Sequence, residues 1–75
     1  MKLPIISGIE LIKFLNKKDF VIVGQKGSHV RLKKKTSELV LVTIVPLHKK
    51  IDVGTLLAIL RQCEIEREEL IEEFK

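Results

Sequence analysis

A histidine with two neighbouring cations stands in the run Gln25–Leu32, Gln-Lys-Gly-Ser-His-Val-Arg-Leu, which is typical of a turn followed by a strand. Side chains alternate between the two faces of a strand. One face would carry Ser28, Val30 and Leu32, and the other would carry His29, Arg31 and Lys33. The apolar set predicts the core face, so the imidazole is expected on an open, positively charged face. Such a face can hold a phosphodiester and move a proton on it.

RNA cleavage without a metal asks for these residue types, because the ribose 2′-hydroxyl is itself the nucleophile. An imidazole ordinarily titrates near pH ~6.5, which suits the proton transfer. Strand alternation and the adjacent cations make His29 a candidate for this proton transfer, and whether it would serve the attacking or the leaving oxygen stays open. Lys26 and Arg31 can offset phosphate charge, Gly27 allows close approach of the RNA backbone, and Ser28 can donate a hydrogen bond. By residue type alone, His29 would be an ordinary surface histidine.

Three further features are weaker. His48 follows Pro46 beside Lys49 and Lys50, and we interpret it as an RNA contact or a plain loop residue rather than a second acid or base. Lys33 begins a three-lysine run, interpreted either as a solvated hairpin tip or as a phosphate contact. Cys63 and two distant histidines do not have zinc-ligand spacing, so no metal and no cofactor is expected, and Cys63 is interpreted as a small core or boundary residue.

Length and charge limit the class of protein. The 75 residues predict one domain spanning 1–75, and 45% hydrophobic content favours a folded chain. Residues 1–50 hold 11 Lys/Arg against three acidic residues, a net charge of +8, while residues 51–75 have a net charge of −4. This asymmetry indicates a polyanionic partner, although solvated charged faces are equally common. The single cysteine fits a reducing, cytoplasmic location, and no signal peptide or membrane span is apparent.

The hydrophobic pattern predicts an α+β fold in the order α-β-β-β-α, with a three-stranded antiparallel sheet and a short C-terminal helix. Ser7 and Glu10 form a capping box for a helix over 7–18, and Asp52 caps a second helix. The predicted strands are 20–23, 28–34 and 39–45, with turns at 24–27 and 35–37 and a stop at Pro46. A terminal helix begins near Glu66.

The third predicted strand is apolar on both faces. One face carries Leu39, Leu41 and Val45, and the other carries Val40, Val42 and Ile44. Helices on one side of the sheet cannot cover both sets. Either the terminal helix wraps around the sheet, or a protein partner or second copy covers the far side.

The sequence resembles the HicA family, the RNA-cleaving toxins of HicA–HicB pairs. The resemblance runs in order along nearly the whole chain, and its most specific part is Lys26-Gly27-Ser28-His29. The other shared features are Ser7-Gly8 with Glu10-Leu11-Ile12, Phe20, Gln25, Val45-Pro46 followed by His48, and Gly54-Thr55-Leu56 with Ile59-Leu60 and Gln62.

The resemblance implies a fold like that of a double-stranded-RNA-binding domain. It also implies an mRNA interferase of a type II toxin–antitoxin system, an endoribonuclease acting on mRNA and neutralised by a HicB-like antitoxin, with the family's active histidine at His29. The expected RNA-binding residues are Lys26, Gly27, Ser28, Arg31, Lys33 and His48. Two alternatives stay open: a non-catalytic RNA-binding domain using the same basic face, and a subunit that mainly docks another protein, including a homodimer through the apolar sheet face.

Overall fold

The first helix begins where the sequence supplies a reciprocal cap. In the computed structural model, which describes residues 2–75, α1 spans Gly8–Lys17. Ser7 Oγ accepts a hydrogen bond from the Glu10 amide at 3.1 Å, and Glu10 Oε1 accepts one from the Ser7 amide at 2.9 Å. These two bonds satisfy amides that the helix cannot pair internally, which confirms the predicted capping box.

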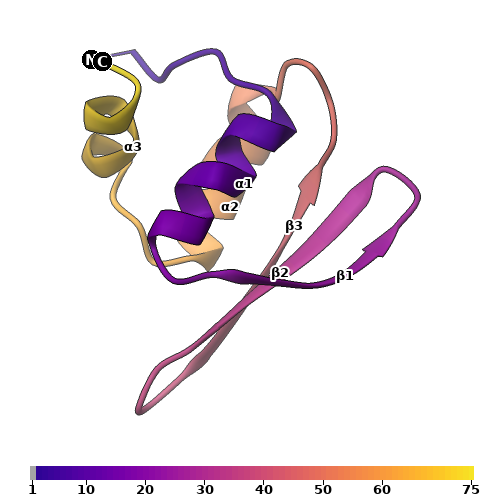
Figure 1. Cartoon of the computed structure of the whole chain (residues 1–75). Helices are drawn as coiled ribbons and strands as arrows, with labels where there is room; N and C mark the ends of the chain where they lie inside the picture. The colour runs from indigo at the N-terminus through magenta and orange to yellow at the C-terminus, as the bar shows by residue number, and fades with distance from the viewer. Residues whose placement is uncertain (1) are drawn as a thin grey trace.

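Three strands follow and form an antiparallel sheet in the order β1-β2-β3, with all the helices on one side of it (Figure 1). The strands are β1 (Val21–Lys26), β2 (His29–Lys35) and β3 (Val40–Pro46). The fold class and element order are therefore as predicted.

The predicted first turn is wrong. Residues 24–26 belong to β1, and the turn is only Gly27-Ser28. The pairing of β1 with β2 shifts by one residue between Ile22 and Gly24, so Val23 forms a bulge and the strand continues through the glycine. A glycine in a strand often marks such a bulge, and here it resembled the start of a loop.

The core lies between the inner sheet face and the two longer helices. The second helix, α2 (Val53–Gln62), begins after Asp52, whose Oδ2 accepts the Thr55 amide hydrogen bond at 3.0 Å. The apolar stripes of both helices meet the inward-facing residues of the strands, as period-3.6 and period-two patterns require. The fully buried members are Leu11, Leu15, Phe20, Leu32, Val45, Leu56 and Leu70.

The terminal helix, α3 (Arg67–Glu73), packs beside α1 and not across the sheet (Figure 1). The rings of Phe14 and Phe74 lie 6.3 Å apart between centroids, and Lys18 Nζ forms an ion pair with Glu69 Oε1 at 2.8 Å. The interpretation that this helix wraps around to the far side of the sheet is therefore wrong.

The side of the sheet away from the helices, here called the outer face, is left open. The strand register places on it Val21, Gly24 and Lys26 of β1, His29, Arg31, Lys33 and Lys35 of β2, and Val40, Val42 and Ile44 of β3. The four aliphatic residues of this set are each 44–57% exposed. Apolar side chains therefore surround a row of cations on one uncovered surface.

Candidate functional site

A tight hairpin positions the imidazole of His29. Gly27 has φ +59°, and with Ser28 it forms the two-residue turn between the paired residues Lys26 and His29. Glycine with positive φ at the first central position is typical of a type II′ hairpin turn, whose twist matches the flanking strands. Gln25 Nε2 also donates a hydrogen bond to the Gly27 carbonyl at 3.0 Å. The turn thus fixes Lys26 directly opposite His29 on the outer face.

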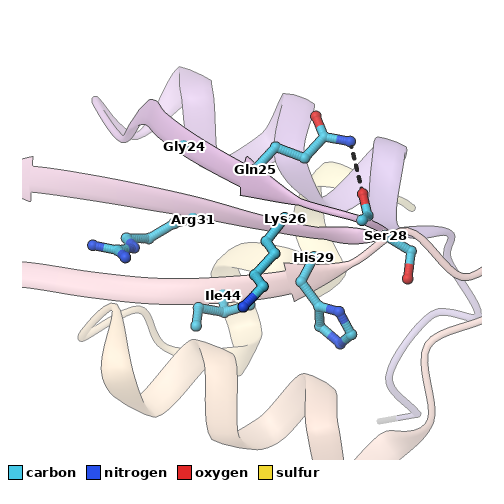
Figure 2. A pocket seen from close by; sticks show the side chains of 8 residues that line it. Gly24, Gln25, Lys26, Ser28, His29, Arg31 and Ile44 are labelled. Carbon is cyan, nitrogen blue, oxygen red and sulfur yellow. Dashed lines mark hydrogen bonds between the residues drawn. The ribbon is translucent and has the colours of Figure 1, made fainter.

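The hairpin borders a hollow of about 730 Å³ that opens to solvent. Its volume lies within the range of ~300–1,000 Å³ typical of small-ligand sites. Figure 2 shows the side chains of Lys26, His29, Arg31 and Ile44 projecting from one side of the sheet. The lining residues are Gly24, Gln25, Lys26, Gly27, Ser28, His29, Arg31 and Ile44.

The cations of the hollow are free to meet an anion. His29 and Arg31 are exposed, whereas Val30 and Leu32, which alternate with them along β2, are 3% and 0% exposed. No carboxylate within residues 2–75 pairs with Lys26 or Arg31. An imidazole between two unpaired cations is an arrangement that can hold a phosphodiester and exchange a proton with it.

Comparison with protein families gives a match to the family model described as HicA toxin of bacterial toxin-antitoxin, over residues 8–65. The chain belongs to the HicA toxin family. The matched segment runs from the first residue of α1 beyond the end of α2 and includes the whole hairpin with His29. Searches of curated proteins and of solved structures gave no match. Membership in the HicA family implies a toxin that pairs with a HicB antitoxin.

The structure brings five of the predicted site residues of this HicA chain into the hollow and leaves two outside it. Lys33 lies on the outer face two residues beyond Arg31, outside the lining. His48 lies in the loop after β3, where its backbone carbonyl accepts a hydrogen bond from the Gly8 amide at 2.9 Å. That loop adjoins the hairpin, because the Leu47 amide donates to the Ser28 carbonyl at 2.7 Å.

Three residues that line the hollow are not among the site residues that the sequence predicts: Gly24, Gln25 and Ile44. Gly24 and Ile44 lie opposite Arg31, one on each neighbouring strand. The sequence pattern instead predicts Gly24 in a turn and Ile44 on an apolar strand face. Because His29 pairs with Pro46, antiparallel counting places Arg31 opposite Ile44. The correct bounds of the second turn would therefore have predicted Ile44 beside Arg31. The bulge at Val23 is what brings Gly24 opposite Arg31.

The lysine run does not form a single surface. Lys34 points to the helix side, where its Nζ lies 5.8 Å from the centroid of the Phe20 ring, while Lys33 and Lys35 share the outer face. The run also lies within β2 and not at a hairpin tip, because the turn follows Lys35. The interpretation as a hairpin tip is therefore wrong, and the phosphate contact stays a prediction for Lys33 and Lys35, the two lysines on the outer face.

The cysteine has a structural environment. Cys63 is 3% exposed, and burial raises the pKa of its thiol to about 11. It stays protonated near neutral pH, which disfavours a nucleophilic role and confirms its interpretation as a core residue. Within residues 2–75, no three His, Cys, Asp or Glu side chains gather closely enough to hold a metal ion. In the same residues, no helix has the length and apolar character that crossing a membrane requires.

Proposed function

We propose that this HicA toxin is an endoribonuclease, an mRNA interferase of a type II toxin–antitoxin system, that cuts mRNA by histidine-dependent chemistry without a metal. The observation that carries the proposal is the exposed His29 imidazole in a hollow whose two cations have no carboxylate partner. Those cations, Lys26 and Arg31, come from the two strands that the turn joins.

The reaction can proceed with the groups that line this hollow and with water. A ribose 2′-oxygen attacks the adjacent phosphorus while its proton passes to a base, and the bond from phosphorus to the 5′-oxygen breaks. The products are a 2′,3′-cyclic phosphate and a 5′-hydroxyl, whose proton comes from the protonated base or from water. His29 transfers a proton at one end of this sequence, which is worth roughly 10²–10⁴ in rate.

The remaining predicted residues bind the RNA. Lys26 and Arg31 offset the charge that develops on the phosphoryl oxygens, and Arg31 can do so with two hydrogen bonds. Gly27 has no neighbouring atom within 4 Å of where a Cβ would stand, so the sugar-phosphate chain can approach the turn beside Ser28. Lys33 and His48 extend this contact surface along β2 and into the loop after β3.

The test compares the two histidines. We expect wild-type protein to cut an mRNA in the presence of a chelator and to leave 2′,3′-cyclic phosphate ends. His29→Ala should abolish cleavage while thermal unfolding and RNA affinity change little, because the side chain is exposed. His48→Ala removes the other imidazole and should reduce cleavage only modestly.

Two results would contradict this assignment. A wild-type protein that binds RNA but cuts nothing would support the alternative of a non-catalytic RNA-binding domain. Loss of activity on adding chelator would instead require a metal.

We further propose that the antitoxin covers the outer face, since exposed aliphatic residues share that uncovered face with His29. Val42 is 44% exposed at the middle of β3, and Val53 on α2 is a matched apolar residue, 59% exposed, on the helix side. Val42→Asp should abolish the complex with the product of an adjacent reading frame, and Val53→Asp should not. A second copy of the chain is the other partner that could cover this face, and sedimentation of the isolated chain tests it. A dimer that is lost in Val42→Asp would favour the second copy over the antitoxin.

A further inference from the structure

One row of residues crosses the outer face beside the catalytic hairpin: Gly24 on β1, Arg31 on β2 and Ile44 on β3. Gly24 leaves a gap in this row, because a Cβ built there would meet no atom within 4 Å. Its φ is not positive, so the backbone conformation does not require glycine. Gly24 therefore widens the hollow, and it is not needed for the conformation of the turn.

The row has one polar, one apolar and one empty position. Arg31 supplies a flat guanidinium group with no carboxylate of residues 2–75 paired to it. Ile44 supplies an aliphatic wall and is 51% exposed. The bare backbone of Gly24 leaves room beside Arg31 for a planar group of the size of a nucleobase, and Ile44 stands on the other side of Arg31.

No phenylalanine ring within residues 2–75 lies on the outer face, so none can stack on a base there. Phe14 and Phe20 are buried in the core, and Phe74 packs against Phe14 on the helix side. Proteins that bind unpaired bases stack them on aromatic rings or on arginine planes. Arg31 is also the only arginine of the sheet, since Arg61 and Arg67 belong to α2 and α3.

We propose that the Gly24–Arg31–Ile44 row is a base-binding subsite, which seats the unpaired base of the nucleotide whose 2′-hydroxyl faces His29. The proposal rests on the proposed ribonuclease function. His29 and Arg31 stand two residues apart on one strand face, about 6.8 Å along the strand, so one nucleotide can present its ribose to the first and its base to the second. A base that is paired and stacked in a duplex cannot enter the gap, so the substrate is single-stranded RNA.

The first experiment fills the gap. Gly24→Val places a β-branched side chain where nothing obstructs it, and valine favours strands, so folding should be kept or improved. We expect cleavage of a single-stranded oligoribonucleotide to fall about 5- to 150-fold, the value of one stacked base. Val40→Leu is the matched control, because it adds bulk to the outer face at the far end of β3. Equal rates for Gly24→Val and wild type would overturn the proposal.

The second experiment separates stacking from charge. Arg31→Lys keeps the positive charge and loses the plane. It should slow cutting of an intact oligonucleotide more than cutting of one with an abasic ribose on the 5′ side of the cut bond, because the loss of two-point phosphate contact affects both substrates and the loss of stacking affects only the first. An equal loss on both substrates would make Arg31 a phosphate contact only. Wild-type cleavage of the same sequence as a perfect duplex at the single-strand rate would likewise refute the subsite.

The third experiment holds even if the chain cuts nothing. In a His29→Ala background, fluorescence anisotropy with the same single-stranded oligonucleotide measures binding alone. Gly24→Val in this background should lower affinity about 5- to 150-fold. An unchanged affinity would eliminate the subsite, whereas lowered affinity in a protein without ribonuclease activity would keep the subsite and reject the proposed catalysis.

Discussion

Replacing Gly8 by alanine should destabilise this protein because the start of α1 lies directly against the end of β3. A Cβ at Gly8 would stand 2.1 Å from the carbonyl oxygen of Pro46 and 3.0 Å from the Cα of Leu47, both backbone atoms. Real Cβ contacts essentially never fall under 3.0 Å, so helix and strand must separate by about 0.9 Å. The Gly8 amide also donates to the His48 carbonyl at 2.9 Å, and this bond would be strained by the same movement.

The expected cost follows from these two contacts. Overpacking costs about 1–3 kcal/mol, and loss of the hydrogen bond to the His48 carbonyl about 0.5–1.5 kcal/mol. Replacing glycine by alanine in a helix returns at most about 1 kcal/mol. Gly8→Ala should therefore lower the free energy of unfolding by about 0.5–4.5 kcal/mol, against the ~4–11 kcal/mol expected for a chain of this length. Because Pro46 is the pairing partner of His29, RNA cleavage should fall as well.

Gly54→Ala is the control for this change. Gly54 also lies in the first turn of a helix, but its Cβ would meet only the Asp52 Oδ2 atom at 3.4 Å, an ordinary contact. This variant should be as stable as wild type or gain up to about 1 kcal/mol. Urea unfolding followed by circular dichroism measures both free energies. A Gly8→Ala protein as stable as wild type, or a Gly54→Ala protein equally destabilised, would refute the packing argument.

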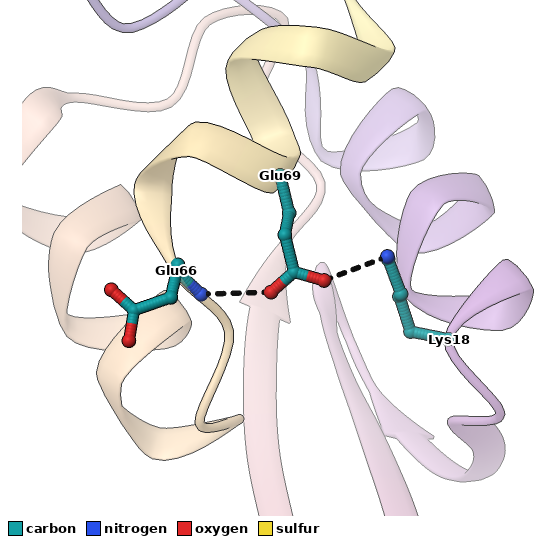
Figure 3. A network of polar contacts seen from close by, with 3 residues as sticks. All are labelled: Lys18, Glu66 and Glu69. Carbon is teal, nitrogen blue, oxygen red and sulfur yellow. Dashed lines mark hydrogen bonds and ion pairs between the residues drawn. The ribbon is translucent and has the colours of Figure 1, made fainter.

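Three further predictions concern charge and pH. Burial raises the pKa of the Cys63 thiol from 9.0 to about 11, so the free energy of unfolding should decline as the pH rises from about 9 to 11. A thiol reagent should label Cys63 in the native protein only at the rate at which the protein unfolds around it. Lys18 holds the pKa of the Glu69 carboxyl below its usual value (Figure 3). The contribution of this ion pair to the free energy of unfolding is therefore present above pH ~4.3 and is lost on further acidification. In urea titrations, Glu69→Gln should make the free energy of unfolding depend less on pH in this acidic range. Lys33→Gln should reduce the slope of log RNA affinity against log salt by about 0.7, while Lys34→Gln, on the helix side, should leave it unchanged; equal effects would remove Lys33 from the RNA surface.

The elements with local signals were predicted closely. The Ser7/Glu10 capping box and the Asp52 cap fixed the starts of both longer helices within a residue, because a cap is decided by side chains three positions apart. The alternation around His29 also placed Val30 and Leu32 in the core. The prediction of the first turn was wrong at Gly24, because β1 continues through a bulge to Lys26. A bulge is set by pairing with β2, and nothing within 21–26 specifies it.

The local sequence pattern likewise could not decide whether the terminal helix or another chain covers the outer face of the sheet. Residues 67–73 are amphipathic whichever surface they meet. The contacts of Phe74 with Phe14 and of Glu69 with Lys18 dock them on α1, and the outer face stays open as a result. Those contacts join residues 51 to 60 positions apart, a separation that helical periodicity does not report.

The order of residues in the chain was enough to determine the succession of helices and strands, the face on which His29 stands, and the HicA family. Each of these depends on neighbours within a few positions or on a motif in linear order. The tertiary structure alone decided that Gly24 and Ile44 flank Arg31 and that the apolar outer face is bare. Both depend on strand register and helix docking, which are set by packing between segments distant in sequence.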